Sequence, residues 1–336
     1  MSQINITWNG ISQEKWDVLL RQAERCAFQQ AWAYGALFAQ NNLDVNRFVA
    51  RDVSCDVARD VARDVSCDVA SDVSRDNGAP IAIGQIITRR YFGFVKFSLL
   101  LKGPIWLGNV TTDQKEIILQ NIRARYPLKR FNLFTFSPDE KTGQAKYEDM
   151  GFREIITGNS TVLIDLKLPE DALWQNLYGK NRTDIRKAEK NNFEVIFSDH
   201  NHIYTDWLLK KEKKQQKEKK YQGLPVGLSK NYGLLYAPGQ GVFTAFAVNK
   251  EKNTPICGIL VLRHGDCATY HIGWNGREGR KCRALNLLLW QMILKLKQAG
   301  VATLDLGGIN TAEGADIARY KLQFGGRVIK LGGTFM

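Results

Sequence analysis

Apolar and polar residues follow two periods along this chain, and the elements that they predict recur in a similar order in its two halves. Alternating apolar and polar residues predict strands, whereas apolar residues three and four positions apart predict helices. In the first half, strands are expected at about 46–50, 79–88, 92–101 and 130–136, and helices at about 13–24 and 113–125. In the second half, strands are expected at about 161–166, 193–197, 243–248, 256–262, 268–274 and 301–310, and helices at about 171–190, 206–220 and 285–299. Strands interleaved with helices predict an α/β (α+β) fold in both halves.

A third pattern interrupts the first half between residues 51 and 76. A four-residue unit repeats there, with valine at every fourth position from Val53 to Val73 and an aspartate before each valine. This period drifts around a helix and places every valine on one face of a strand, so neither structure buries much apolar surface. We therefore interpret 51–76 as a weakly ordered low-complexity insert in the loop of a β-hairpin. Its four arginines and seven aspartates make it acidic in an otherwise basic chain.

Length and charge narrow the class of protein. The 336 residues are enough for two domains, and the hydrophobic fraction of 44% is ordinary for a globular protein. The formal net charge of +13 favours phosphates, RNA or an anionic membrane face as partners. A basic protein without such a partner is equally compatible with this composition.

The sequence favours a cytoplasmic location. Its first residues lack the basic and apolar regions of a signal peptide. The most apolar stretch, 91–107, is interrupted by Lys96, Lys102 and Pro104, and is too short and polar to cross a bilayer.

Cysteine and histidine usage argues against metal and nucleophile chemistry. None of the six cysteines forms a C-x-x-C pair, and no histidine stands at ligand spacing from them, so no metal site is expected. Cys257 and Cys267 flank an apparent hairpin turn, and two reduced strand cysteines are the favoured interpretation there. The four histidines form no recognisable Ser-His-Asp or Cys-His arrangement.

Residues 270–326 carry the pattern most informative about function. A strand from Tyr270 leads into a basic loop that ends at Arg283, then a helix, a second strand and a glycine turn. This layout resembles the GNAT acyltransferase fold, and two such folds in tandem resemble the Fem family, the aminoacyl-tRNA-dependent transferases that add amino acids to peptidoglycan precursors. The segments that carry the resemblance are Gln30-Ala-Trp-Ala-Tyr-Gly35, Gly103-Pro104, Asn181-Arg182-x-x-x-Arg186-Lys-Ala-x-Lys190, Tyr270-His-Ile-Gly, Leu285–Trp290, Leu306-Gly-Gly308 and Tyr320-Lys321-x-x-Phe-Gly-Gly326.

The resemblance implies a domain organisation and a reaction. It implies a first GNAT-like domain at 1–158, a second at 159–326, and a segment 327–336 that returns to the first domain. The implied reaction transfers an amino acid from aminoacyl-tRNA to the amine of a nucleotide- or lipid-linked peptidoglycan precursor. It requires no cofactor, and peripheral contact with the inner face of the membrane is compatible with it.

The resemblance also assigns the site residues. Lys321, next to Tyr320 and held by the glycine turn, is expected closest to the chemistry, where an ammonium group would face the ester carbonyl or a phosphate. The expected substrate-binding residues are Trp32, Gly103, Arg182, Arg186, Tyr270 and Tyr320. An exposed structural lysine and a solvated helix face are the alternative interpretations of Lys321 and of the arginine pair.

Two departures from the family pattern keep other functions open. Phe38 stands where the family usually has a phosphate-binding lysine, and no aspartate follows Gly103-Pro104. One alternative is a CoA-dependent N-acyltransferase, although the loop 276–284 lacks the second glycine of a pyrophosphate-binding loop. The other is a non-catalytic RNA-binding protein on a transferase scaffold.

Overall fold

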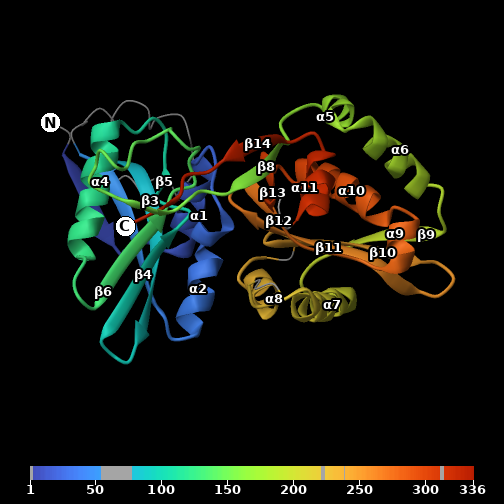
Figure 1. Ribbon diagram of the computed structural model, residues 1–336, viewed down its shortest axis with the longest axis horizontal. Helices are drawn as coiled ribbons and strands as arrows, with labels where there is room; N and C mark the ends of the chain where they lie inside the picture. The colour runs from blue at the N-terminus through green and yellow to red at the C-terminus, as the bar shows by residue number, and fades with distance from the viewer. Residues whose placement is uncertain (1–2, 54–77, 221–223, 238, 311–313) are drawn as a thin grey trace. The chain divides into compact units, whose positions relative to one another are not determined.

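The structure, a computed structural model, describes residues 3–53, 78–220, 224–237, 239–310 and 314–336. The chain divides into two compact units (Figure 1). Unit 1 comprises residues 1–159 and 330–336, and unit 2 comprises residues 160–329. Each unit is built on one mixed sheet with helices packed against it, which confirms the predicted α/β class.

Unit 1 contains a sheet in the order β1-β2-β3-β4-β6-β15-β7, with β5 paired to β3. Its strands are β1 (Ile4–Trp8), β2 (Asp44–Asp52), β3 (Ala79–Tyr91), β4 (Val95–Leu101), β5 (Ile105–Trp106), β6 (Asn132–Ser137), β7 (Glu154–Ile156) and β15 (Thr334–Phe335). Its helices are α1 (Gln13–Gln22), η1 (Phe28–Gln30), α2 (Trp32–Gln40) and α4 (Thr112–Arg125). The β4–β6 pair is parallel, and the other described pairs of this sheet are antiparallel.

The core of unit 1 explains why α4 lies on one face of the sheet. Alternate strand residues such as Phe48, Ile86 and Leu100 are fully buried against Ile118 and Ile122 of the helix. Strand residues two apart share a face, so this packing uses the period that predicted the strands.

Unit 2 contains a sheet in the order β14-β8-β13-β12-β11-β10-β9. Its strands are β8 (Ser160–Asp165), β9 (Phe193–Ser198), β10 (Val242–Asn249), β11 (Thr254–His264), β12 (Cys267–Asn275), β13 (Thr303–Ile309) and β14 (Arg327–Lys330). Its helices are α5 (Glu170–Asn176), α6 (Gly179–Ala188), α7 (Ile203–Lys219), α8 (Gly227–Leu234), α9 (Arg277–Lys281), α10 (Ala284–Gln298) and α11 (Ala315–Leu322).

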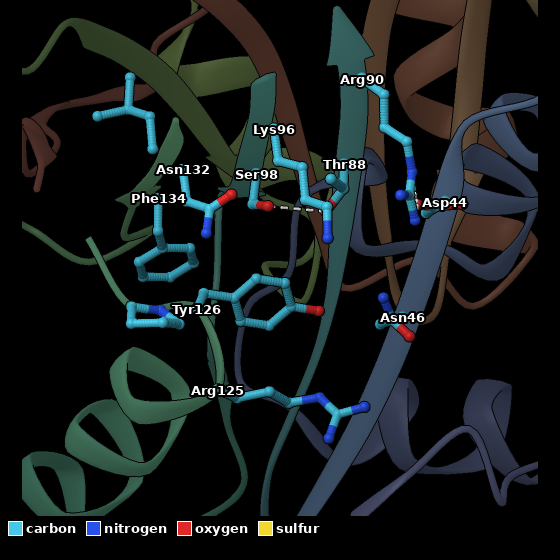
Figure 2. A pocket seen from close by; sticks show the side chains of 12 residues that line it. Asp44, Asn46, Thr88, Arg90, Lys96, Ser98, Arg125, Tyr126, Asn132 and Phe134 are labelled. Atoms are coloured by element: carbon cyan, nitrogen blue, oxygen red, sulfur yellow. Dashed lines mark hydrogen bonds and ion pairs between the residues drawn. The ribbon is translucent and has the colours of Figure 1, made fainter. Parts of the chain in front are cut away.

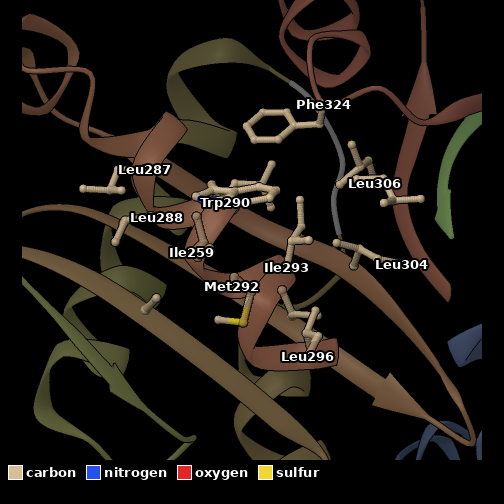
Figure 3. Packing of buried hydrophobic residues seen from close by; sticks show 14 of the residues in the cluster. Ile259, Leu287, Leu288, Trp290, Met292, Ile293, Leu296, Leu304, Leu306 and Phe324 are labelled. Atoms are coloured by element: carbon tan, nitrogen blue, oxygen red, sulfur yellow. The ribbon is translucent and has the colours of Figure 1, made fainter. Parts of the chain in front are cut away.

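Helix α10 supplies more buried residues to the core of unit 2 than any other helix. Leu288, Met292 and Leu296 are buried against strand residues such as Ile259 and Leu304 (Figure 3). The opposite face of the sheet is covered by α7, whose Trp207 packs on Trp274 at a ring separation of 5.1 Å. Because both faces are covered, the strands carry long apolar runs rather than strict alternation.

The predicted helix at 171–190 is two helices, which corrects one expectation about the basic residues. Leu177 and Tyr178 are extended, and the Tyr178 N–H donates to the carbonyl of Gln323 at 3.0 Å. Helix α6 then ends at Ala188. Lys190 therefore lies beyond the helix and does not share a helical face with Arg182 and Arg186.

The repeat insert lies largely outside the described residues, which end at Val53 and resume at Gly78. The strands beside it, β2 and β3, pair antiparallel with Asp52 opposite Ala79. At the C-terminus, β14 belongs to the sheet of unit 2, and β15 lies between β6 and β7 in unit 1.

The described part of the chain offers neither a membrane-spanning helix nor a metal-binding cluster. None of its helices has the length and apolar character needed to cross a membrane. None of its clusters of His, Cys, Asp and Glu side chains could hold a metal ion. Its cysteines Cys257 and Cys282 are free thiols.

Candidate active site

The candidate site lies in unit 2, where two parallel strands separate. β12 pairs with β13 only as far as Thr269 and Asp305. Just beyond Asp305 the pairing of β13 with β8 shifts, and Gly307 adopts a φ of +79°. β12 bulges as well, because its pairing with β11 skips His271. Bulges bend a strand and redirect its side chains, and these two open a gap in the backbone of the sheet.

The ammonium group of Lys321 lies across this gap. Lys321 is only 9% exposed, and its Nζ donates a hydrogen bond to the carbonyl of Gly308 at 2.7 Å. A Cβ placed on Gly307 would lie 3.4 Å from Lys321 Nζ and 3.8 Å from the carbonyl oxygen of Tyr270. The ammonium group and the two separating strands therefore meet at one point. The last turn of α11 holds Lys321, and the glycine turn, with Gly325 at φ +73°, follows it.

A carboxylate next to the gap sets the charge of Lys321. Asp305 accepts hydrogen bonds from the Gly307 N–H at 2.7 Å and from the Thr161 hydroxyl. Burial lowers the pKa of Lys321 to about 8, and the negative charge of Asp305 opposes this shift. Lys321 is therefore charged at neutral pH and loses its proton in mildly alkaline solution.

Two half-buried tyrosines, Tyr270 and Tyr320, line the same region. The Tyr320 hydroxyl donates to the carbonyl of Leu285 at 3.0 Å. The Tyr270 hydroxyl occupies the space that a Cβ on Gly273 would need. Burial raises the pKa of both tyrosines, and Tyr270 lies close enough to add to the shift of Tyr320. The structure thus brings Tyr270, Tyr320 and Lys321 together, with both phenols neutral.

Asn181, from the motif on α6, connects that helix to the site. Its side chain is fully buried, and its Nδ2 donates to the carbonyl of Gln323 at 3.1 Å. Its Oδ1 accepts from Asn286 of α10 at 2.8 Å. Because an unpaired buried amide is costly, this arrangement fixes α6, α10 and the end of α11 to one another.

Arg182 and Arg186 do not point toward Lys321. The Arg182 guanidinium donates to the carbonyls of Gln175, at 2.9 Å, and Leu177 at the end of α5. The Arg186 guanidinium lies over the ring of Trp174, 5.5 Å from its centre, and this side chain is exposed. Arg182 therefore caps a helix, and Arg186 presents a cation at the surface.

The basic loop between β12 and α10 is folded into a short helix. Helix α9 uses the loop amides internally, since the N–H groups of Arg280 and Cys282 donate to the carbonyls of Gly276 and Glu278 at 2.9 and 3.1 Å. A pyrophosphate-binding loop needs such amides free to face the anion. The loop contacts α6, because the Nε of Arg283 lies 3.5 Å from the carboxylate of Asp184. The exposed cations of α6 and of this loop are Lys180, Arg186, Lys187, Arg277, Arg280, Lys281 and Arg283, and Lys190, also exposed, follows α6.

In unit 1, Trp32 packs against the guanidinium of Arg47, and Gly103 packs against the amide of Gln30. The Arg47 guanidinium lies 3.6 Å from the centre of the Trp32 ring, and burial lowers the pKa of Arg47 to about 10. Gly103 is packed tightly, since a Cβ there would lie 3.0 Å from Gln30 Nε2. Gln30 in turn donates to the carbonyl of Leu101 at 2.6 Å.

Comparison with known proteins identifies the fold. Residues 179–322 match the family model of the acetyltransferase (GNAT) domain. The match lies within unit 2, so this unit resembles the acyltransferases of the GNAT class. No curated protein matches it in sequence.

Solved structures are similar in fold along both units. The structure of FemX has a TM-score of 0.75 and 13% identity, over 98% of this chain and 96% of that chain. The structure of a conserved protein from Bacteroides thetaiotaomicron has a TM-score of 0.59 and 9% identity, over 98% of this chain and 99% of that chain. The structure of a tandem GNAT protein from the clavulanic acid biosynthesis pathway has a TM-score of 0.53 and 10% identity, over 99% of this chain and 98% of that chain. At these identities the likeness concerns the fold, and it confirms a GNAT-like fold in each of the two units.

Three residues of the site were not predicted from the sequence. Asp305, Thr161 and Asn181 organise the surroundings of Lys321, and only Asn181 stands in a segment used for the resemblance. A single aspartate inside an apolar strand, directly before Leu306-Gly-Gly308, was the available signal for Asp305.

Proposed function

We propose that this protein is an acyltransferase of the GNAT class and moves an amino acid from aminoacyl-tRNA to the amine of a peptidoglycan precursor, in the cytoplasm. The observation that carries the proposal is the position of Lys321, a buried ammonium group at the gap between β12 and β13. A positive charge held in a shielded site stabilises negative charge that develops in a transition state far better than one in water does.

The chemistry needs little more than this charge. The amine nitrogen of the acceptor attacks the ester carbonyl carbon of the aminoacyl group, and negative charge develops on the carbonyl oxygen. The bond to the tRNA ribose oxygen then breaks, and the proton lost by the amine ends on that oxygen. Lys321 would donate a hydrogen bond to the developing oxyanion or to the departing oxygen, and Asp305 would keep Lys321 charged.

The surface next to this gap supports RNA as the carrier of the acyl group. Exposed lysines and arginines of α6 and of the α9 loop lie on neighbouring elements, joined by the contact between Arg283 and Asp184. Phosphate groups of a nucleic acid are bound by such clusters. The internal hydrogen bonds of the α9 loop argue in the same direction, because they occupy amides that a CoA pyrophosphate would use.

A peptidoglycan precursor as acceptor is supported by the fold of the chain, which resembles that of FemX over 98% of its residues. The second candidate is a CoA-dependent N-acyltransferase. It is favoured by the match of residues 179–322 to the acetyltransferase (GNAT) domain.

A transfer assay separates these functions. The protein is incubated with a lipid II-type or a UDP-linked acceptor and with either radiolabelled aminoacyl-tRNA or radiolabelled acetyl-CoA. We expect label to move from aminoacyl-tRNA, and Lys321→Ala to lower the rate of transfer by about 100-fold or more. Lys213→Ala, a change at an exposed lysine on α7, is the matched control and should leave the rate unchanged.

The other results contradict the proposal in distinct ways. Label from acetyl-CoA alone would identify the CoA-dependent enzyme. Transfer that survives in Lys321→Ala would remove the role of the ammonium group. RNA binding without transfer from either donor would favour the binding protein on a transferase scaffold.

A further inference from the structure

One end of the unit 1 sheet carries a polar pocket that the transferase chemistry does not use. The strand residues that face α4 are apolar near the middle of the sheet and polar beyond the end of the helix. The pocket has a volume of about 170 Å³ (Figure 2). Its polar and aromatic lining includes Asp44, Asn46, Thr88, Arg90, Lys96, Ser98, Arg125, Tyr126, Asn132 and Phe134.

The pocket has an excess of positive charge. Arg90 and Lys96 are directly opposite on β3 and β4, an arrangement that is unfavourable for like charges. Asp44 is the one carboxylate among the lining residues, and it is bound to Arg90 at 2.7 Å. Lys96 and Arg125 contribute two further cations to the lining. An anion in the pocket would relieve the repulsion that remains.

Polar groups without a charge complete the lining. The Thr88 and Ser98 hydroxyls hydrogen-bond each other at 2.8 Å on the buried sheet face. The Tyr126 hydroxyl is buried and makes no well-aligned hydrogen bond among the described residues, and its polar neighbours are Arg125 and Asn46. Burial raises the pKa of Tyr126, and neighbouring Arg125 opposes the shift. A buried donor without a well-aligned partner is costly, so this hydroxyl is suited to bind an oxygen of a ligand.

The pocket adjoins an aromatic tip. The turn that joins β3 to β4 presents Phe92, which is 89% exposed and has a φ of +51°. A left-handed turn position favours glycine or asparagine, so folding alone does not explain a phenylalanine there. Phe94 and Phe131 pack edge to face beside it at 5.1 Å, and Tyr91 is 40% exposed.

The exposed apolar residues are concentrated at this end. Of the 13 exposed large apolar side chains in the described residues, five belong to it: Tyr91, Phe92, Phe94, Leu128 and Phe131. The segments 88–98 and 125–132 that form the tip also hold six cations and no acidic residue. The cations are Arg89, Arg90, Lys96, Arg125, Lys129 and Arg130.

We propose that this end of unit 1 docks on an anionic lipid bilayer, with the aromatic tip in the interfacial layer and the phosphate of a lipid headgroup in the pocket. Aromatic rings and basic side chains together are the composition of surfaces that bind anionic membranes. The pocket is smaller than the roughly 300–1,000 Å³ of sites for drug-sized ligands, which suits a headgroup rather than a whole metabolite. The proposal does not depend on the transferase reaction.

Vesicle flotation with the full-length protein tests this proposal. The protein is mixed with vesicles of phosphatidylcholine and phosphatidylglycerol in a two-to-one ratio, or with phosphatidylcholine alone, and the floated fraction is measured. We expect binding only to the mixed vesicles, weakening as salt is raised. Lys96→Gln should lower the partition coefficient roughly fivefold, and Phe92→Ser with Phe94→Ser roughly tenfold or more.

Control variants distinguish binding by the pocket and the tip from nonspecific electrostatic or hydrophobic binding to vesicles. Lys213→Gln removes an exposed cation on α7, and Ile203→Ser removes an apolar side chain that is 73% exposed in unit 2. Both should bind vesicles like the parent protein. Phe92→Trp should retain binding, because tryptophan also suits the interface.

Several outcomes would overturn the proposal. It fails if mixed vesicles do not bind, or if the control variants weaken binding as much as Lys96→Gln does. Titration with inorganic phosphate and with glycerol 3-phosphate tests the source of the anion. Tight binding of either without vesicle binding would assign the pocket to a soluble ligand. Loss of tRNA binding in Lys96→Gln, again without vesicle binding, would assign it to RNA.

Discussion

The two units share a fold, and they differ where it matters for chemistry. In unit 1 the parallel strands β4 and β6 stay paired from Lys96 and Asn132 to Leu101 and Ser137. The pairing even continues, because the Gly103 N–H donates to the carbonyl of Ser137 at 3.1 Å. In unit 2 the corresponding strands β12 and β13 part after Thr269 and Asp305.

This difference in strand pairing suits the two units to different roles. An open gap between strands exposes backbone groups and admits a side chain, and in unit 2 that side chain is Lys321. In unit 1 no such gap opens between β4 and β6. The Gln30 amide instead bridges β3 and β4, accepting from the Gln85 N–H at 2.8 Å and donating to the carbonyl of Leu101 at 2.6 Å. Two copies of one fold thus support a division in which unit 2 carries the chemistry and unit 1 carries binding surfaces.

Substituting one glycine in each unit gives the sharpest test of this division between the units. Gly307→Ala adds a methyl group 3.4 Å from Lys321 Nζ, at a φ of +79° that alanine tolerates poorly. We expect the single-turnover rate to fall at least tenfold, because a displacement of about 1 Å in an active site has effects of this size or larger. Rapid-quench measurement with labelled aminoacyl-tRNA reports this rate.

Gly103→Ala is the matched change in unit 1. The new Cβ would lie 3.0 Å from Gln30 Nε2 and from Leu100 Cδ1, so the buried amide has to move. We expect a loss of about 1–3 kcal/mol in unfolding free energy, measured by urea denaturation. An equal loss of single-turnover rate in both variants would contradict the division between the units.

The titration of Lys321 should make both the transfer rate and the unfolding free energy depend on pH, with smaller effects than the glycine substitutions. Its pKa is about 8 when folded, compared with 10.5 for an ordinary lysine. The rate of transfer should therefore decline as the pH rises through about 8, where the ammonium group is lost. The unfolded chain binds more protons between these two values, so this group makes the protein more stable as the pH rises through that window.

Lys321→Met tests both parts of this expectation. It should remove the alkaline decline from any residual activity and flatten the rise in unfolding free energy between pH 8 and 10.5. At neutral pH the variant should be at least as stable as the parent protein, since it no longer buries a charge. A large loss of stability would show that Lys321 is structural.

The sequence predicts the order of the main elements well, and the reason is local periodicity. Strands such as β10 and helices such as α10 bury long, regular apolar patterns that are visible without tertiary information. Short elements such as α9 and β15 lack such a pattern. Lys321 was expected in a glycine turn because Phe324-Gly-Gly follows it, but the hydrogen bonds of α11 extend through it.

The surroundings of the site were harder to predict. The gap arises from two bulges, and a bulge depends on the partner strand rather than on the bulged residues alone. The pocket in unit 1 likewise combines residues from several strands. Along these strands alternate side chains still face α4, but the facing residues change from apolar to polar toward the pocket. The sequence offered Lys321, Tyr320 and Tyr270 as candidates, and whether Tyr270 lies near the other two depends on tertiary structure.

The smallest expected effects concern two arginines that the sequence treats as equivalent. Arg182→Ala removes hydrogen bonds to the carbonyls of Gln175 and Leu177, so we expect a loss of about 1–2 kcal/mol in unfolding free energy. Arg186→Ala removes an exposed cation over Trp174 and should change stability by less than about 0.5 kcal/mol. If α6 binds RNA, Arg186→Ala should instead lower the affinity for tRNA and reduce the slope of its salt dependence by about one. An unchanged slope together with unchanged transfer would leave α6 as a solvated face, and the RNA surface of unit 2 would then rest on the α9 loop alone.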